Sequence, residues 1–444
     1  MIDNAEGASM TRIMLMGALL IGLLACAGAQ KPESPANPIE ATAPKPLIGT
    51  SAPVVHLTLS NQGLDHPGLW RQNMCLADIN GDGHVDLICP PPRAESKRPY
   101  IFLGDGKGGW REWSEARFPK LSYAYGGVDA GDIDGNGLTD LVLGCHQSNM
   151  TVMLQTSPGV FTQARDGLPD ATHFSSRAVK LCDVNGDGRP EIIAVNETAV
   201  YPDGLRFNPN RQKVFSFKNG LWSEIPILPL SPRPMAFGDS LVVADFNGDG
   251  RPDFVSASNV FGLKQILFIN RSDGFHAQDI AAIPDASYIF QVAAGDFDRD
   301  GRMDLACTMV TFDYSEEAQK DSVKVMRSRM GLLINRGETW EFHELIGSDE
   351  EKTKRKYSGL VVADFNGDGL PDIAAVFDDG NLVLFLNQGG LKFVRARTPG
   401  WVVRGKVSWM GAADINEDGT PDLVAAFGSE QQAGGLTAYI VSTK

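Results

Sequence analysis

A nine-residue acidic motif occurs seven times in this 444-residue sequence. Position 1 is always Asp, positions 3 and 5 are Asp or Asn, position 6 is always Gly, and position 9 is Asp or Glu. Side-chain oxygens at positions 1, 3 and 5, followed by a glycine that permits a sharp turn, form the beginning of a calcium-binding loop. The seven copies occupy residues 78–86, 132–140, 183–191, 245–253, 296–304, 364–372 and 414–422.

The spacing predicts a calcium site in every copy. A hard cation takes roughly six to eight oxygen ligands. We expect the side chains at positions 1, 3, 5 and 9, and the backbone carbonyl of position 7, to supply most of them. The predicted ligands of up to seven structural Ca²⁺ ions are Asp78, Asn80, Asp82, His84, Asp86, Asp132, Asp134, Asn136, Leu138, Asp140, Asp183, Asn185, Asp187, Arg189, Glu191, Asp245, Asn247, Asp249, Arg251, Asp253, Asp296, Asp298, Asp300, Arg302, Asp304, Asp364, Asn366, Asp368, Leu370, Asp372, Asp414, Asn416, Asp418, Thr420 and Asp422.

The alternative is a metal-free hairpin turn, because Asn-Gly-Asp-Gly sequences also favour turns. A turn needs no carboxylate at position 9, however, and all seven copies have one. Positions 1, 3, 5 and 9 hold three carboxylates in six copies and four in the copy from Asp296, or 22 in total, and the chain has a formal net charge of −15. Seven Ca²⁺ ions would add +14 and leave about −1, so the charge balance also favours metal binding.

The motifs must be positioned by the segments between them, whose period of about fifty residues indicates a repeat architecture. Each unit is expected to contain four strands, which in the sixth unit are 359–363, 372–377, 381–387 and 391–397. Four-stranded units in series are typical of β-propellers, in which neighbouring units cover each other's faces. Small residues before each motif, such as Ala363, suit innermost strands that converge on an axis.

The predicted fold is therefore all-β: a seven-bladed β-propeller with four-stranded blades. The last unit has only two strands after its motif, at 423–427 and 436–442. The segment 54–59 (VVHLTL) precedes the first unit and has no other partner. We expect this N-terminal strand to complete the last blade and close the ring, which leaves no open sheet edge there.

Two runs of sequence resemble a known family: GDIDGNGLTDLVLG (131–144) and VVADFNGDGLPDIAAV (361–376). They are similar to FG-GAP/VCBS repeats, which occur in integrin α-subunit propellers and in many bacterial surface proteins. The resemblance covers residues 53–444 and implies seven blades, with Ca²⁺ in the loop that joins the first two strands of each. The chain departs from the pattern at position 4, where Arg299 and Glu417 replace Gly.

Residues 1–26 are expected to be a signal peptide, because Arg12 precedes an apolar run that ends Leu-Leu-Ala-Cys at Cys26. This ending resembles the lipobox of bacterial lipoproteins, which implies lipidation of Cys26 and, with Ala27 next, sorting to the outer membrane. The alternative is an ordinary secretory signal with an incidental cysteine. Residues 27–52 are expected to form a flexible Pro-rich linker. The propeller (53–444) would then be anchored in the bacterial cell envelope, outside the cytoplasm.

Composition and missing motifs narrow the function. A pI near 4.9 argues against nucleic acid and against anionic membrane surfaces as partners. The sequence has no GxSxG, HExxH or CxxC motif, so it offers no catalytic signature.

Cys75 and Cys89 flank the first motif symmetrically, and either a cross-strand disulfide or two buried free thiols would fit.

The face opposite the metal loops is the expected ligand-binding face, because the connections between blades and two insertions, 196–212 and 311–321, fall there. Aromatic and basic residues approach the inner strands on this face. The candidates for ligand binding are Trp70, Tyr125, Arg177, Phe237, Tyr288, Tyr357, Arg404 and Trp409. The alternative is that these aromatic residues cap the core and the charged residues are simply solvated.

Together these features predict a surface-anchored, non-enzymatic binding module for a protein or polysaccharide partner. One alternative is a carbohydrate-active enzyme, such as a polysaccharide lyase, with its site on the face opposite the calcium loops. Another is a scaffold in an envelope complex. Fold alone does not decide among them.

Overall fold

The computed structural model describes residues 52–70, 73–93, 98–196, 212–228, 240–257, 265–283, 287–312, 326–346, 357–403, 405–429 and 432–443. The predicted signal peptide lies outside these residues, as does the predicted linker except for Ala52. The described residues belong to one compact unit, and every regular element among them is a strand. These residues include no helix that is long and apolar enough to cross a membrane.

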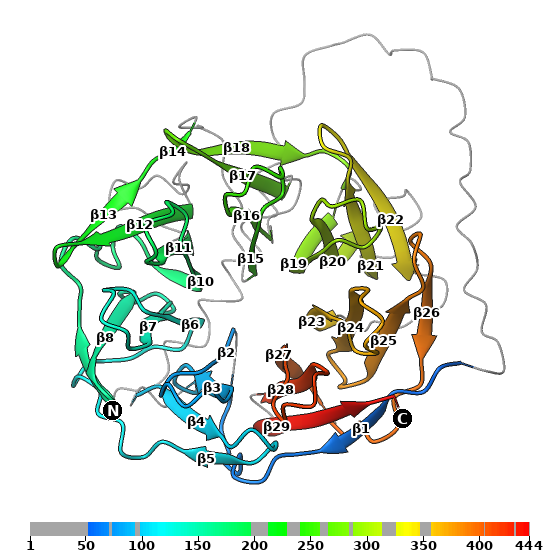
Figure 1. The fold of residues 1–444 in the computed structure, drawn as a ribbon, viewed down its shortest axis with the longest axis horizontal. Coiled ribbons are helices and arrows are strands. Elements are labelled where there is room, and N and C mark those ends of the chain that lie inside the picture. The colour runs from blue at the N-terminus through cyan, green and yellow to red at the C-terminus, as the bar shows by residue number, and fades with distance from the viewer. Residues whose placement is uncertain are drawn as a thin grey trace, which may run out of the picture. The chain divides into compact units, whose positions relative to one another are not determined.

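The strands form seven sheets arranged as a ring around a central axis (Figure 1). Six sheets have four strands and one has five. From the axis outward, the first three blades are β2 (Cys75–Ala77), β3 (Asp86–Cys89), β4 (Tyr100–Gly104), β5 (Trp110–Glu112); β6 (Val128–Gly131), β7 (Asp140–Leu143), β8 (Thr151–Ser157), β9 (Val160–Gln163); and β10 (Ser176–Cys182), β11 (Glu191–Asn196), β12 (Gln212–Lys218), β13 (Leu221–Ile225).

The remaining four blades continue the same order. They are β15 (Leu241–Ala244), β16 (Asp253–Ser256), β17 (Gln265–Arg271), β18 (Gly274–Ile280), β14 (Ile227–Leu228); β19 (Ser287–Gly295), β20 (Asp304–Phe312), β21 (Met326–Asn335), β22 (Trp340–Ile346); β23 (Tyr357–Ala363), β24 (Asp372–Phe377), β25 (Leu382–Asn387), β26 (Phe393–Ala396); and β27 (Val407–Ala413), β28 (Asp422–Ser429), β29 (Gln432–Ser442), β1 (His56–Leu59). The predicted all-β, seven-bladed propeller is confirmed.

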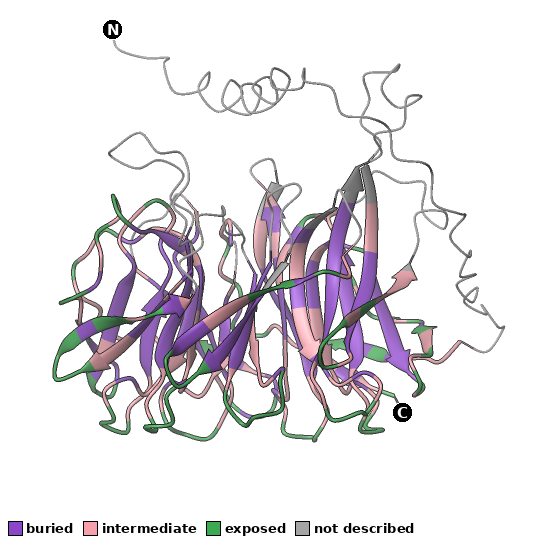
Figure 2. Cartoon of the chain, turned by 90° about the horizontal axis from the view of Figure 1, so that it is seen from above, coloured by how far each residue is buried: buried purple, intermediate pink, exposed green. Residues whose placement is uncertain are grey.

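Hydrophobic cores lie between neighbouring blades. One cluster, for example, combines Leu141 of β7 with Ile88 of β3, and another combines Leu332 of β21 with Ile373 of β24. The second strand of each blade has a neighbouring blade on both sides, so runs such as Asp140–Leu143 are buried at every residue. Figure 2 shows the strands mostly buried and the loops along one face mostly exposed.

The cysteines at the first motif are free thiols on opposite sides of their sheet. Cys75 pairs with Ile88 across β2 and β3, so Cys89, the next residue, points to the other face. Cys75 packs in the core toward the second blade, and Cys89 packs in the core toward the last blade. Both are buried and neither forms a disulfide.

Connections between blades cover the outer edges of the sheets. The fifth strand, β14, comes from the connection before its blade and pairs parallel with β18. An isolated parallel bridge between Arg117 and Val160 repeats this arrangement. Val54, which precedes β1, forms a further parallel bridge with Arg397, next to the outer strand of the sixth blade. An outer strand that is covered in this way offers fewer unpaired backbone groups for association with other chains.

The N-terminal strand β1 pairs antiparallel with β29 along its whole length and is the outermost strand of that sheet. The segment around it contacts the blades on both sides. The Val55 N–H donates to the Arg397 carbonyl at 2.9 Å, and the Trp110 N–H donates to the Gln62 carbonyl at 3.0 Å.

Candidate metal sites

The first aspartate of each motif holds the loop that joins the first and second strands. In the loop 78–86, Asp78 Oδ1 accepts the Gly81 N–H at 2.7 Å and Oδ2 accepts the Gly83 N–H at 2.8 Å. Gly81 and Gly83 have φ of 78° and 88°, a conformation that glycine adopts without steric cost. The other loops repeat the bond from position 6 to position 1 at 2.7 to 3.0 Å.

Positions 3 and 5 are linked by N–H groups that offset the repulsion between neighbouring oxygens. The Asn Nδ2 at position 3 donates to the Asp Oδ2 at position 5, at 2.8 to 3.0 Å, in the loops 78–86, 245–253, 364–372 and 414–422. The loop 132–140 reverses the pair, with Asn136 donating to Asp134 at 3.4 Å. The loop 296–304 has Asp at both positions, and there Arg336 donates to Asp298 at 2.5 Å.

The residue at position 7 is held by its backbone in all seven loops. Its N–H donates to the side-chain Oδ1 at position 5 at 2.8 to 3.0 Å. This bond explains why position 7 tolerates residues as different as His84, Leu138, Arg189 and Thr420. A backbone carbonyl is the only ligand that the sequence predicts from this position.

The carboxylate at position 9 is fully buried in every loop. Asp86 Oδ2 accepts the Ile79 N–H at 3.0 Å, and Oδ1 accepts the Gly104 N–H of β4 at 2.8 Å, so Asp86 joins the loop to the third strand. Burial raises the pKa of Asp86 to about 6 and the pKa of Asp372 and Asp422 to about 7. A cation beside these carboxylates would favour their charged form.

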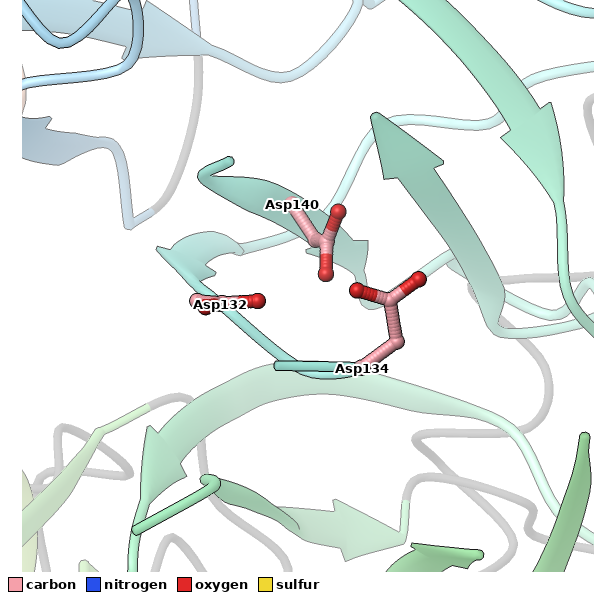
Figure 3. Close-up of side chains that lie close together, drawn as sticks. All are labelled: Asp132, Asp134 and Asp140. Atoms are coloured by element: carbon pink, nitrogen blue, oxygen red, sulfur yellow. The ribbon is translucent and has the colours of Figure 1, made fainter. Parts of the chain in front are cut away.

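In two loops the carboxylates converge closely enough to share one ion. Oxygen atoms of Asp132, Asp134 and Asp140 lie within 4.8 Å of one another, and Figure 3 shows the three carboxylates facing the same space. An equivalent group consists of Asp296, Asp298 and Asp304. Donor sets made only of oxygen suit Ca²⁺ or Mg²⁺ rather than zinc. The residues present therefore fit a hard divalent cation.

Arg299 and Glu417, which replace glycine at position 4, keep the loop conformation, with φ of 63° and 59°. Each side chain contacts the loop of the next blade. Arg299 Nη2 donates to the Gly369 carbonyl at 3.0 Å, and Glu417 Oε1 lies 2.5 Å from His84 Nδ1. The two departures from glycine thus connect neighbouring loops and keep the left-handed backbone at position 4.

Sequence reasoning missed four buried amides at the ends of third strands, which we call the bridging amides: Gln155, Asn270, Asn335 and Asn387. Each donates to the carbonyl of position 2 in the preceding blade's loop, at 3.2, 2.6, 2.7 and 3.0 Å respectively. The signal was a repeated Ile-Asn or Leu-Asn at the end of three third strands. The acceptors lie 76 to 90 residues earlier in the chain, so the sequence did not reveal them.

Those residues predicted to bind a ligand whose side chains are described are buried or half-buried. Trp70 and Tyr357 are core residues. Tyr125 is half-buried, with the His146 ring 4.7 Å away and the Arg93 guanidinium 5.5 Å from its ring centroid.

For the other predicted ligand-binding residues, the structure gives burial, backbone position or no description. Arg177 and Trp409 are half-buried in β10 and β27. Tyr288 belongs to β19, of which only the backbone is described at that residue. Phe237 and Arg404 lie outside the described residues, as do both insertions except near their ends.

Comparison with known proteins identifies the repeat. The FG-GAP-like repeat matches residues 78–143, 132–194, 245–307 and 364–425, which together span more than half of the chain. Every match begins at the first aspartate of a loop. The motif that positions the candidate metal ligands is therefore also the start of the family's repeat.

The individual proteins that match this chain have low sequence identity to it. The T-cell immunomodulatory proteins of Mus musculus and Rattus norvegicus are each 23% identical over 320 residues, which is 69% of this chain and 50% of each relative. The chain thus spans about half the length of these relatives. Integrin alpha pat-2 of Caenorhabditis elegans is 28% identical over 144 residues, 30% of this chain and 12% of that protein. Among solved structures, a chain from the crystal structure of BBS1N in complex with ARL6DN aligns with a TM-score of 0.46 at 10% identity, covering 85% of this chain and 94% of that chain.

Proposed function

Because the chain belongs to the FG-GAP-like repeat family, we propose that it is a calcium-stabilised, non-enzymatic module that binds a protein partner. The equivalent loops carry the proposal, since each presents oxygen donors around a turn at one end of a blade. The relatives support a binding role, because neither an integrin alpha chain nor an immunomodulatory protein is named as an enzyme.

The ions would act on stability. The residues that would hold Ca²⁺ lie between the first and second strands, and the carboxylate at position 9 also bonds the third strand, as Asp372 does with Asn387. At ~1 mM Ca²⁺ and a Kd of ~0.1 mM, each site would contribute about 1.4 kcal/mol. Several such sites together are comparable with the ~5–15 kcal/mol stability of a typical domain.

Thermal unfolding of the purified chain tests the calcium role. We expect the melting temperature to fall by about 10 °C or more when EGTA replaces ~1 mM Ca²⁺, and to recover when Ca²⁺ is added back. Addition of K⁺ at matched ionic strength is the control. An unchanged melting curve in EGTA would refute the calcium role.

The partner would bind the face opposite the metal loops, where Tyr125 lies between Arg93 and His146 at the junction of the first two blades. A photo-crosslinking residue in place of Tyr125 should give discrete protein adducts in intact cells, identified by mass spectrometry. The same residue in place of Gln388, which is exposed at a turn on the metal-loop face, is the control. Equal adducts from both positions, or the release of unsaturated sugars from a polysaccharide by the purified chain, would contradict this function.

The proposal includes a location: a lipid anchor at Cys26 that holds the propeller in the bacterial cell envelope, at the outer membrane. The sequence Leu-Leu-Ala-Cys supports this location. Cells grown with a labelled fatty acid should label the wild type but not Cys26→Ser. A wild type without label would contradict the anchor and leave the calcium role unaffected.

A further inference from the structure

The loop 183–191 differs from the other six in its last residue, which is Glu191 rather than Asp. The additional methylene group extends the carboxylate toward position 3. Asn185 Nδ2 donates to Glu191 Oε1 at 2.5 Å, and the Ser216 hydroxyl of β12 donates to the same oxygen at 3.0 Å. The Val184 N–H donates to Oε2 at 3.0 Å.

The backbone fixes which end of the Asn185 amide faces Glu191. The Asp187 N–H donates to Asn185 Oδ1 at 2.8 Å. Because this oxygen is an acceptor for the backbone, the NH₂ group is the end that reaches the carboxylate. An NH₂ group cannot coordinate a cation.

The loop 245–253 is a matched comparison, because its sequence differs only at positions 2 and 9. Asn247 Oδ1 accepts the Asp249 N–H at 2.9 Å, as in the loop 183–191. Asn247 Nδ2, however, donates to Asp249 Oδ2 at 3.0 Å rather than to the carboxylate at position 9.

Glu191 and Asp253 differ in how many hydrogen-bond acceptor positions they leave for an ion. A carboxylate offers about four lone-pair positions, two on each oxygen. Asp253 accepts one backbone N–H on each oxygen, from Phe246 at 3.0 Å and Asn270 at 2.8 Å, so each oxygen keeps one position for an ion. Glu191 accepts two donors on Oε1, which fills that oxygen, and one on Oε2.

We propose that the loop 183–191 is the weakest of the seven calcium sites and that Glu191 is the cause. A Ca²⁺ ion there must displace the Asn185 NH₂ group and draw Glu191 away from Ser216. In the loop 245–253 the side-chain donors lie on Asp249 Oδ2, which accepts Asn247 Nδ2 at 3.0 Å and Arg251 Nη2 at 2.6 Å, and none lies on the carboxylate at position 9. We expect its dissociation constant to be about tenfold higher or more, the equivalent of ~1.4 kcal/mol. The inference rests on the calcium role proposed above.

Calcium-binding isotherms of the full 444-residue chain test this, measured by equilibrium dialysis with radioactive Ca²⁺. Wild type should show six sites that fill together and a seventh that fills at higher free Ca²⁺. Glu191→Asp should bring the seventh site into the main group. The reciprocal variant, Asp253→Glu, should create a second weak site and leave five strong ones.

Seven equal sites in the wild type, or a weak site that persists in Glu191→Asp, would overturn the inference. A wild type that binds no Ca²⁺ would instead contradict the calcium role itself, so the two failures are distinguishable. Circular dichroism checks that each variant keeps its sheets. If Asp253→Glu does not fold, Glu191→Asp still decides, because the expected result there is the gain of a strong site.

Discussion

At position 4 of the loops, backbone strain and a side-chain contact oppose each other. A non-glycine residue in the left-handed conformation costs roughly 1–2 kcal/mol relative to glycine. Glu417 has this conformation, and its side chain contacts His84 of the next loop. An exposed contact of this kind contributes little, so strain is the larger effect.

Two substitutions of Glu417 distinguish the effect of backbone strain from that of the side-chain contact. We expect Glu417→Gly to be at least as stable as wild type, because it removes the strain. Glu417→Ala keeps the strain and loses the contact, so it should be less stable than Glu417→Gly by about 1 kcal/mol. Urea unfolding in saturating Ca²⁺ measures the difference. Equal stabilities for the two variants would show that the backbone strain is negligible.

The buried carboxylates at position 9 predict a pH dependence of the calcium effect. Their folded-state pKa is raised, to about 6 for Asp86 and about 7 for Asp372 and Asp422. In metal-free protein the stability that they contribute is therefore greatest below their ordinary pKa and is lost as the pH rises through these folded-state values. Ca²⁺ requires the charged form and so competes with protons.

We expect the increase in melting temperature on adding Ca²⁺ to be larger at pH ~8 than at pH ~5.5, because at the lower pH protons must first be displaced. Calorimetry at both pH values, with EGTA samples as the reference, measures it. An increase that is the same at both values, or larger at the lower one, would contradict this assignment.

Residue types and spacing were sufficient to predict the loops, because Asp and Gly at fixed positions have few structural roles. They were insufficient for Trp70 and Tyr357, which were expected near a binding face and are core residues. Tyr357 begins β23, where core and surface differ by a single residue of register. Trp70 lies in the segment before β2, where no strand periodicity indicates which side chains are buried.

At the scale of elements, the bridging amides join the third strand of one blade to the metal loop of the blade before it. Asn387 Nδ2 donates to the Phe297 carbonyl at 3.0 Å and to the Pro371 carbonyl at 3.3 Å, and Oδ1 accepts the Gly389 N–H at 2.9 Å. Three backbone groups of different elements therefore depend on one buried side chain.

Replacement of this amide should be strongly destabilising. Asn387→Leu leaves the buried backbone partners unpaired, at ~1–3 kcal/mol each, so we expect a loss of about 2–4 kcal/mol in the free energy of unfolding. Gln388→Leu, at the exposed neighbouring position, is the control and should change stability by less than about 0.5 kcal/mol. Similar losses for the two variants would mean that the bridging contact is unimportant.

The strands themselves were largely predictable, because each unit alternates apolar runs with turn residues. In the sixth blade, β24 (Asp372–Phe377) coincides with the expected strand. The two-residue strand β14 was not foreseen, since Ile227–Leu228 is too short to show a period and its partner β18 lies beyond the next metal loop.

At the scale of the whole molecule, each core lies between two blades, so no blade can bury its faces alone. Leu57 of β1 and Val55, which directly precedes β1, belong to the core between the last two blades. Burial of each such side chain is worth ~1.5–3 kcal/mol, and β1 also covers the outer edge of β29.

A chain that begins at Gly63 should therefore be less stable than one that begins at Ala52, and it should self-associate through the exposed edge of β29. Thermal unfolding and light scattering after gel filtration measure the two effects. The longer chain is the matched control, because it lacks the predicted signal peptide and linker but keeps β1. Two monomeric chains with the same melting temperature would contradict the role of β1 in closing the ring.

The direction of β1 also determines on which side of the ring the described chain begins. Because β1 runs antiparallel to β29, with His56 opposite Ser442, it starts on the side of the ring that carries the acidic loops. A tether attached before residue 52 would therefore hold the ring by that side. Tyr125 and its neighbours lie on the opposite side of the ring, so a chain segment attached before β1 would leave the proposed protein-binding face uncovered.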